Sequence, residues 1–334
     1  MSSQHKQYAI PTPILQKKKK KTPKHANMGK ELFDVMVVPG CGKGLVARTY
    51  IPRGTRIISE APLFSISNFA QTSLTDIVAY VTSILKKLPK DQQRGFLGLH
   101  NAFIRQASPF YGIVRTNSLP FGPESPELGL FLTCARLNHS CSPNANHSWN
   151  SDTRTESVHA IRDIDPGEEI TICYQSSQSS HSNRASRQDE LLKMFGFECH
   201  CMICVLPAED SRESDQRRAE IEELDRIIGS GELLVRNAPR ALGACRTIIE
   251  HLEDEGIQDM RVARAYYDAF QICVSNGDMA RASVFARKHI EEVICCEGED
   301  APGLKERQAC RTGLGLTMMI LRGGCGRELC MFER

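Results

Sequence analysis

The spacing of hydrophobic residues changes along the chain, and it predicts strands first and helices later. Short apolar segments at 33–38, 45–47 and 56–59 are separated by turns rich in glycine and proline, which is typical of strands in tight hairpins. From residue 74 to residue 88 the apolar positions recur every three or four residues, which predicts a helix that Pro89 ends. A proline-rich stretch through Pro109 and Pro120 is interpreted as loop. Segments 158–164 and 170–174 then predict two strands around the turn 165–167.

The second half of the chain follows a helical period. Amphipathic stripes at 241–252, 262–273 and 282–293 are joined by short turns, which predicts an α-solenoid-like region over 211–300 without a clean repeat. Packing is the favoured interpretation of these stripes. A serine-rich segment, 176–186, is interpreted as the linker before this half. Residues 301–334 form a poorly defined tail to which we assign no function.

Charge is distributed unevenly. The 334 residues contain 42 Lys and Arg against 40 Asp and Glu, but residues 1–30 hold eight lysines and no acid, which leaves a net charge of −6 elsewhere. That composition predicts a disordered basic tail, either an address or tether or simply a solvated leader, on a mildly acidic body. Because no apolar run could span a bilayer and the N-terminus is polar, we expect no membrane segment and a location in the nucleus or cytoplasm.

Three cysteines form a dense cluster at Cys199, Cys201 and Cys204. Fourteen cysteines without an export signal favour reduced thiols over a disulfide scaffold. Three thiols within six residues can converge on one ion, and a structural zinc site takes four soft ligands in a tetrahedron. The fourth ligand could be His200 or a distant cysteine such as Cys141. Three unrelated cysteines are the alternative.

Four sequence blocks together resemble the SET-domain protein lysine methyltransferases. They are Gly42-Lys43-Gly44-Leu45, the nine residues from Arg136 to Asn144, the block from Gly167 to Tyr174, and Phe197 ahead of the cysteine triplet. The resemblance implies an α+β fold: a SET domain of short strands over 31–176 with a helical insertion at about 67–130, a zinc-bound post-SET loop at 187–205, and an α-helical C-terminal region. It is similar to the SET-and-MYND subgroup and to fungal SET proteins of that type. The MYND zinc finger is absent, because no cysteine lies between Cys41 and Cys134.

The resemblance also implies a site for S-adenosylmethionine. Lys43, Gly44 and Leu45 would bind its amino-acid end through backbone groups, since glycine allows the main chain to approach a ligand closely. Asn138 would hold the amino group and His139 the adenine, with Asn117 as a further contact and Phe197 stacked on the adenine. Cys141 becomes the fourth zinc ligand. Taken singly, Gly44 would be interpreted as part of a turn and Asn138 as a capping residue. His139 would be interpreted as a histidine whose hydrogen bonds are satisfied, and Phe197 as a core aromatic.

Tyr174 is the predicted catalytic residue, because its hydroxyl would orient the reacting groups in a channel between cofactor and peptide. It need not act as a base, since a tyrosine has a pKa of about 10. We interpret Glu168 and Glu169 as part of a solvated turn, with one glutamate making structural hydrogen bonds.

The sequence therefore predicts a zinc-containing, S-adenosylmethionine-dependent protein lysine N-methyltransferase. Its partner would be a protein with a target lysine, a histone tail being one candidate, and the helical region could bind other proteins. A catalytically inactive SET scaffold is the alternative. The lysine run alone does not support specific nucleic-acid binding, because the body lacks a basic stripe.

Overall fold

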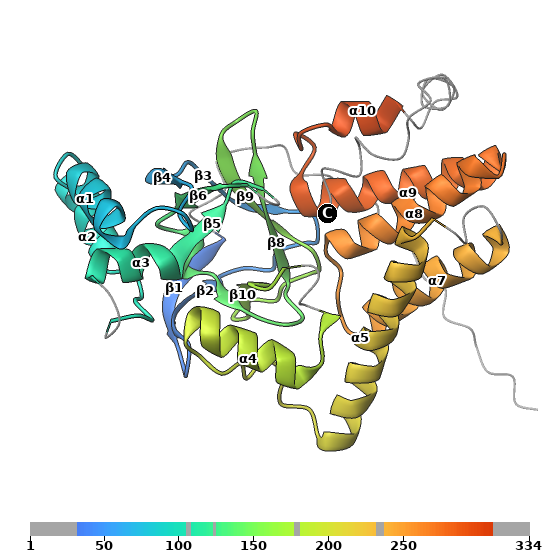
Figure 1. The fold of residues 1–334 in the computed structure, drawn as a ribbon, viewed down its shortest axis with the longest axis horizontal. Coiled ribbons are helices and arrows are strands. Elements are labelled where there is room, and N and C mark those ends of the chain that lie inside the picture. Colours follow the sequence, from blue (N-terminus) through green and yellow to red (C-terminus); the bar gives the residue numbers. More distant parts are fainter. Residues whose placement is uncertain (1–31, 105–107, 123–124, 177–180, 232–236, 310–334) are drawn as a thin grey trace, which may run out of the picture.

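A computed structural model of the chain describes residues 32–104, 108–122, 125–176, 181–231 and 237–309. The strands lie in the middle of the molecule, with one group of helices on each side (Figure 1). The predicted basic tail, residues 1–30, and the segment 312–334 lie outside the described residues.

The described strands form three small sheets. Predicted segments 33–38, 45–47 and 56–59 are confirmed as strands, whereas the strand predicted at 158–164 starts earlier and ends at Ala160. The first sheet has the order β1 (Phe33–Val38), β2 (Gly42–Ala47), β10 (Glu169–Ile172) and β7 (Asn138–His139), and its β7–β10 pair is parallel. The second has the order β3 (Arg56–Glu60), β9 (Thr155–Ala160) and β8 (Ala145–Asn150). The third has the order β4 (Phe64–Ser67), β6 (Glu127–Leu130) and β5 (Ser118–Pro120).

A helical insertion packs beside the third sheet. It contains α1 (Leu74–Leu85), α2 (Lys90–Leu97) and α3 (Pro109–Asn117), and a 3₁₀ turn, η1 (Cys134–Arg136), follows β6. The helix predicted from residue 74 is confirmed, with Ile77, Val81 and Leu85 on its buried face. The loop predicted around Pro109 is wrong. Pro109 occupies the first turn of α3, where its missing N–H would have no intrahelical partner anyway.

The second half is helical, as predicted. It consists of α4 (Arg184–Phe195), α5 (Ala208–Gly229), α7 (Ala238–Asp254), α8 (Met260–Ser275), α9 (Met279–Glu297) and the short α10 (Leu304–Ala309). The predicted linker 176–186 is wrong from Arg184 onward. The side chain of Asn183 accepts a hydrogen bond of 2.9 Å from the Ser186 amide and so caps the start of α4.

The helical half packs directly against the strands through α9. Asn146 of β8 donates to the carbonyl of Cys296 at 3.1 Å, and Asn150 donates to the carbonyl of Asp300 at 2.8 Å. Arg53 forms an ion pair with Glu292 from the same helix. Beneath this contact lies the core of the strands, in which Leu45 and its neighbours are fully buried. The strands thus lie between two groups of helices (Figure 1).

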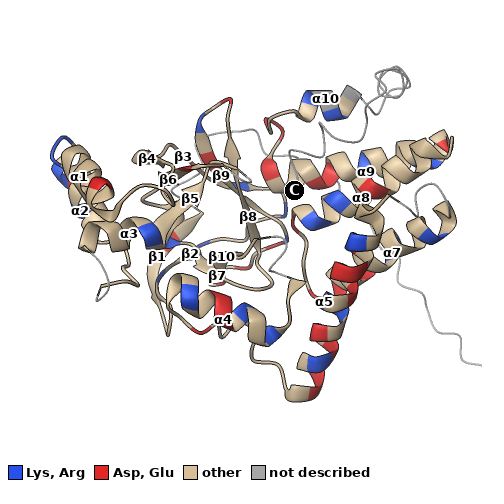
Figure 2. Ribbon diagram, in the orientation of Figure 1, with Lys and Arg blue, Asp and Glu red and all other residues tan. Residues whose placement is uncertain are grey.

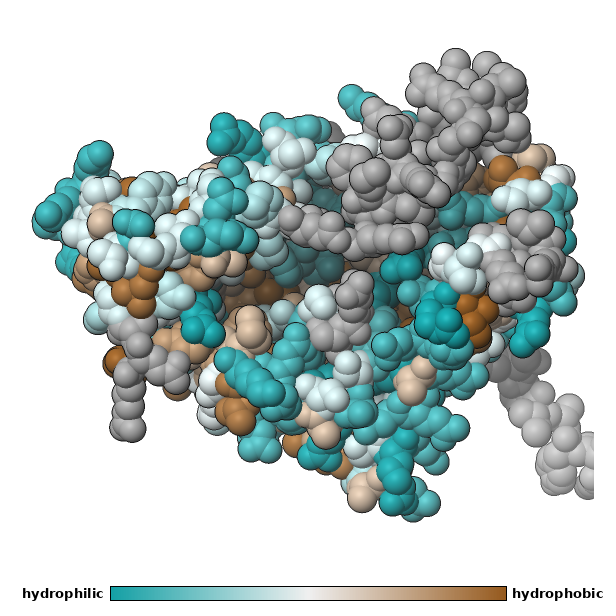
Figure 3. All heavy atoms as spheres, viewed as in Figure 1, coloured by the Kyte–Doolittle hydropathy of each residue, from teal (hydrophilic) through white to brown (hydrophobic). Residues whose placement is uncertain are grey.

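The described surface carries charged side chains and several exposed large hydrophobic residues. Acidic side chains outnumber basic ones along α5 (Figure 2), and hydrophilic residues predominate on the face shown in Figure 3. Among the described residues, none of the helices is long and apolar enough to cross a bilayer.

Candidate functional site

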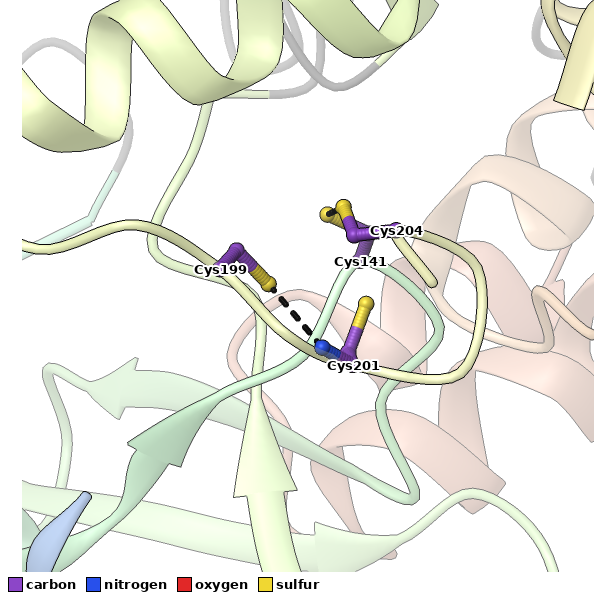
Figure 4. A group of neighbouring side chains, drawn as sticks. All are labelled: Cys141, Cys199, Cys201 and Cys204. Atoms are coloured by element: carbon purple, nitrogen blue, oxygen red, sulfur yellow. Dashed lines mark hydrogen bonds between the residues drawn. The ribbon is translucent and has the colours of Figure 1, made fainter. Parts of the chain in front are cut away.

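The four predicted cysteine ligands meet at one point. Cys141 follows β7, and Cys199, Cys201 and Cys204 lie in the loop after α4, with their side chains directed toward a common centre (Figure 4). All four sulfur atoms lie within 4.8 Å of one another, and the sulfurs of Cys141 and Cys204 are 3.6 Å apart. A tetrahedral site with Zn–S bonds of about 2.3 Å places its sulfurs about 3.8 Å apart. The residues therefore fit zinc.

The alternative fourth ligand is not part of the cluster. His200 is exposed, and its Nδ1 lies 2.9 Å from the carbonyl oxygen of Glu198. Cys141 is 2% exposed and completes the set of four thiols. Hydrogen bonds from Cys141 and the other thiols lower the pKa of Cys201, which favours a thiolate, the form that binds a metal. The geometry favours Cys141 over His200.

The parallel pairing of β7 with β10 brings the predicted catalytic and cofactor residues together. Asn138 lies opposite Thr171, and His139 lies opposite Ile172. The backbone amide of Tyr174, two residues beyond the end of β10, donates to Nδ1 of His139 at 3.0 Å. Because that nitrogen accepts, the proton of a neutral ring sits on Nε2, which lies 3.4 Å from the sulfur of Cys141. His139 thus joins the Tyr174 segment to the cysteine cluster.

Tyr174 is partly buried and stays protonated at neutral pH. Its hydroxyl donates to the carbonyl oxygen of Leu137 at 2.5 Å. Burial raises its pKa well above the ordinary value, and the negative charge of Glu169 adds to the effect. Burial likewise lowers the pKa of His139 to about 4, so the imidazole is neutral at pH 7. The site therefore offers a neutral hydroxyl and a neutral imidazole.

Gly44 makes room for two polar side chains. A Cβ on this residue would lie 2.8 Å from Nδ2 of Asn138 and closer still to the carboxylate of Glu169. Nδ2 of Asn138 donates to Oε1 of Glu169 at 2.7 Å and to the carbonyl of Lys43 at 3.4 Å. Leu45 differs from the prediction, because it is fully buried, pairs with β1 and β10, and is not among the residues that line the cavity.

Glu169 is a site residue that we did not predict. Glu168 makes the expected structural hydrogen bonds, to Asn144 and to the backbone of Asp165. Glu169 instead begins β10, contacts Asn138 and borders the cavity. Burial raises the pKa of its carboxyl group. The alternation of residues along the strand could have indicated this position. Residues 170 and 172 are apolar and buried, so the side chain of residue 169 lies on the opposite side of the strand.

Asn117 and Phe197 both reach the same cavity. Asn117 ends α3 and is 7% exposed, and its Nδ2 donates to the carbonyls of His100 and Ile113, each at 2.7 Å. Only its amide oxygen remains for another partner. Phe197 packs edge-on against Tyr174 with ring centroids 6.2 Å apart. Phe197 is therefore part of an aromatic cluster and also borders the cavity.

One cavity of about 2170 Å³ connects these residues. Ligand pockets for small molecules commonly measure about 300–1,000 Å³, so the space suffices for a cofactor together with a substrate segment. Its lining also includes Trp149, which stacks on Phe121 with ring centroids 3.9 Å apart. Among the predicted residues, those whose atoms line the cavity are Lys43, Asn117, Asn138, His139, Tyr174, Phe197, Cys199 and Cys201.

Comparison with known proteins places this geometry in a family. The SET domain profile matches residues 42–175. The histone-lysine N-methyltransferase set5 of Schizosaccharomyces pombe is 35% identical over 272 residues, which cover 81% of this chain and 81% of that protein. The histone-lysine N-methyltransferase SMYD3 of Homo sapiens is 28% identical over 49% of this chain and 38% of its own length. The protein-lysine N-trimethyltransferase SMYD5 of Mus musculus is 39% identical over 25% of this chain and 20% of its own length. With its short-strand sheets, its helical insertion and this extended similarity, the chain belongs to the SET-domain family.

Proposed function

We propose that the protein is an S-adenosylmethionine-dependent protein lysine N-methyltransferase with a structural zinc ion. One observation carries the proposal: the parallel β7–β10 pair brings Asn138, His139 and Tyr174 to the wall of one cavity beside four convergent thiols. S-adenosylmethionine would supply an activated methyl group on a sulfonium. Lys43 and Gly44 through their backbones, with Asn138, His139, Asn117 and Phe197, are the residues proposed to hold it.

Tyr174 is proposed to orient the reaction. Its hydroxyl proton is directed to the carbonyl of Leu137, so the oxygen keeps its lone pairs for a group in the cavity. The raised pKa means that Tyr174 does not remove the proton from the target lysine. A lysine has a pKa near 10.4 in water, and burial in an apolar channel lowers it. The channel, rather than a side-chain base, would therefore favour the neutral amine.

Glu169 is proposed as a further cofactor-site residue. Its carboxylate accepts from Asn138 at 2.7 Å, and a Cβ on Gly44 would collide with it. A half-buried carboxylate beside an asparagine suits a positively charged amino group. Substitution of Glu169 by Gln should therefore weaken cofactor binding while leaving the hydrogen bond from Asn138 possible.

Histone lysines are the proposed substrates. The proposal rests on the similarity to set5 of S. pombe, which extends over 81% of both chains. Such a substrate implies a nuclear location, and the net charge of −6 outside residues 1–30 suits a basic peptide.

The test combines binding and turnover. Purified zinc-loaded protein should bind S-adenosylmethionine in calorimetry and transfer labelled methyl groups to a histone mixture, with the modified lysines mapped by mass spectrometry. The absence of cofactor binding would refute the enzyme and favour the scaffold. Cofactor binding with labelling of other proteins in a cell extract, but not of histones, would refute only the substrate class.

A further inference from the structure

One edge of strand β8 is open toward the cavity. The order of the second sheet is β3, β9, β8, so β8 is a terminal strand that pairs, among the described strands, with β9 alone. Four consecutive residues of β8, from Asn146 to Trp149, line the cavity and are only partly buried. Successive side chains lie on opposite faces of a strand, so a run of neighbours that all reach one cavity places the edge itself there.

The hydrogen-bond pattern of the sheet identifies the backbone groups on this edge. The amide of Ile161 donates to the carbonyl of Asn144 at 3.0 Å, so residues 144 and 161 form a hydrogen-bonded pair, and every second pair along the ladder is of the same type. The intervening residues His147 and Trp149 therefore direct their N–H and C=O groups away from β9. Ala160 agrees with this pattern, because its amide donates at 3.0 Å to the carbonyl of Thr55, on the other side of β9.

These outward groups are not used within the described part of the chain. The N–H of His147 and both backbone groups of Trp149 make no hydrogen bond to a described residue. The carbonyl of His147 accepts only a bond of 3.4 Å from Nδ2 of Asn146. An open strand edge with donors and acceptors at this spacing is a template to which an extended peptide adds as a further strand.

An aromatic stack holds the end of this edge in place. The ring of Trp149 lies on that of Phe121, with centroids 3.9 Å apart and planes inclined by 12°. Gly129 leaves room for these rings, because a Cβ there would lie 2.7 Å from the ring of Phe131 and closer still to Phe121. A strand end confined in this way is ordered before a ligand arrives, which reduces the entropy cost of binding.

The edge belongs to the same cavity as Tyr174, and its surroundings suit a basic peptide. Tyr174, the residue proposed to orient methyl transfer, lines this cavity together with β8. Glu297 lines it too and directly follows Cys296, whose carbonyl accepts from Asn146 of β8 at 3.1 Å. A carboxylate close to the strand complements the charge of a lysine-rich segment. The occupant that meets both conditions is the stretch of protein substrate beside its target lysine.

We infer that β8 is a docking strand for the protein substrate, and that an extended segment beside the target lysine pairs with the backbone of His147 and Trp149. The inference rests on the proposed function and deepens it, because it assigns the part of the cavity that holds the main chain of the substrate. Pairing through the main chain selects an extended conformation next to the lysine rather than one particular sequence.

The first test compares two substitutions at one position. His147→Ala removes the imidazole and its contact of 2.8 Å with Glu156, whereas His147→Pro removes the backbone N–H as well. Because that N–H points away from β9, proline is compatible with this strand, as it is on other edge strands. Melting temperatures establish that both variants fold.

The probe is a synthetic peptide of about ten residues, which spans about 33 Å when extended and is centred on a lysine that the protein labels in the histone mixture or in the cell extract. Its KM should be about tenfold higher for His147→Pro than for His147→Ala, which corresponds to one lost backbone hydrogen bond. The dissociation constant for S-adenosylmethionine should be the same in both variants. Equal KM values would overturn the inference.

A second measurement uses Trp149, which is the only tryptophan of the chain. In wild-type protein loaded with S-adenosylhomocysteine, the product of methyl transfer, the same peptide should change the tryptophan emission with the dissociation constant that calorimetry gives. Binding of the peptide without any change in emission would overturn the inference.

If His147→Pro does not fold, peptides in which one backbone N–H at a time is replaced by N-methyl decide the matter. Their affinity for the wild-type protein should fall at every second position, because only alternate N–H groups of a paired strand face β8. A uniform effect, or none, would overturn the docking strand while peptide turnover leaves the proposed function in place. Wild-type protein that binds no cofactor or labels no lysine would refute the proposed function, and the docking strand with it.

Discussion

Gly44→Ala should impair cofactor binding with little damage to the fold. The added Cβ would lie 2.8 Å from Nδ2 of Asn138 and 2.8 Å from Cγ2 of Val38, against 3.4–4 Å for ordinary contact. The neighbours must therefore move by about 0.6 Å or more, and the Glu169 carboxylate must move as well. Overpacking of this kind typically costs about 1–3 kcal/mol.

The effect on binding follows from which groups must move. Asn138 is the proposed partner of the cofactor amino group, and its hydrogen bond to Glu169 would be strained or lost. A displacement of about 1 Å at a positioned group can cost about 10²-fold in function. We expect the dissociation constant for S-adenosylmethionine, measured by calorimetry, to rise about 10–100-fold. The melting temperature should fall by only several degrees.

Gly243→Ala is the matched control. Gly243 lies inside α7, and a Cβ there would meet no atom within 4 Å. Alanine is favoured over glycine in a helix by about 1 kcal/mol, so the melting temperature should rise slightly with cofactor affinity unchanged. If Gly44→Ala binds the cofactor as tightly as the wild type does, the reasoning about the Gly44–Asn138–Glu169 contact is wrong.

Three further predictions concern catalysis, metal and pH. Tyr174→Phe should abolish methyl transfer in a labelling assay while calorimetry shows cofactor binding largely kept; retained turnover would exclude Tyr174 from catalysis. Removal of zinc with a chelator should weaken cofactor binding, because Cys141 lies 3.4 Å from Nε2 of His139, and added zinc should restore it; unchanged binding by metal-free protein would contradict this link. Burial, with Arg56 acting in the same direction, lowers the pKa of His159 to about 4. Below about pH 6.5, His159 becomes protonated in the unfolded state but stays neutral in the folded state. The free energy of unfolding should therefore fall between about pH 6.5 and pH 4, by up to about 3 kcal/mol. The free energy of unfolding of His159→Gln, measured by denaturant melts, should lack this part of the pH dependence. An identical pH dependence in the wild type and the variant would refute the assignment to His159.

The sequence predicted the elements whose pattern reflects a single buried face. The helix from residue 74 is one such element, because Ile77, Val81 and Leu85 are its buried residues. Strand β8 was missed because the residues from Asn146 to Trp149 are polar or aromatic and only partly buried. Their side chains meet the cavity and α9, so the alternation of polar and apolar residues is absent. Pairing with β9 over six residues forms this strand, and no local pattern reveals that partner.

The part of the site that the sequence predicts well is the group of metal ligands that lie close together along the chain. Three cysteines within six residues indicated a metal, but the choice between His200 and Cys141 needed either the family resemblance or the fold, because Cys141 is 63 residues away from Cys204. Glu169 was not predicted as a site residue for the same reason. It is one acidic residue among many until the fold places it beside Asn138.

The separation between Cys141 and Cys204 also bears on the order in which the protein is made. The ribosome synthesises the chain from the N-terminus onward, so β7, β10 and Tyr174 are made before the last three thiols. The contact of α9 with β8 forms later still, when Cys296 has been added. A nascent chain halted near residue 176 would therefore hold the residues for chemistry without the elements that fix them. The complete site can therefore assemble only after both Cys204 and the end of α9 have been synthesised.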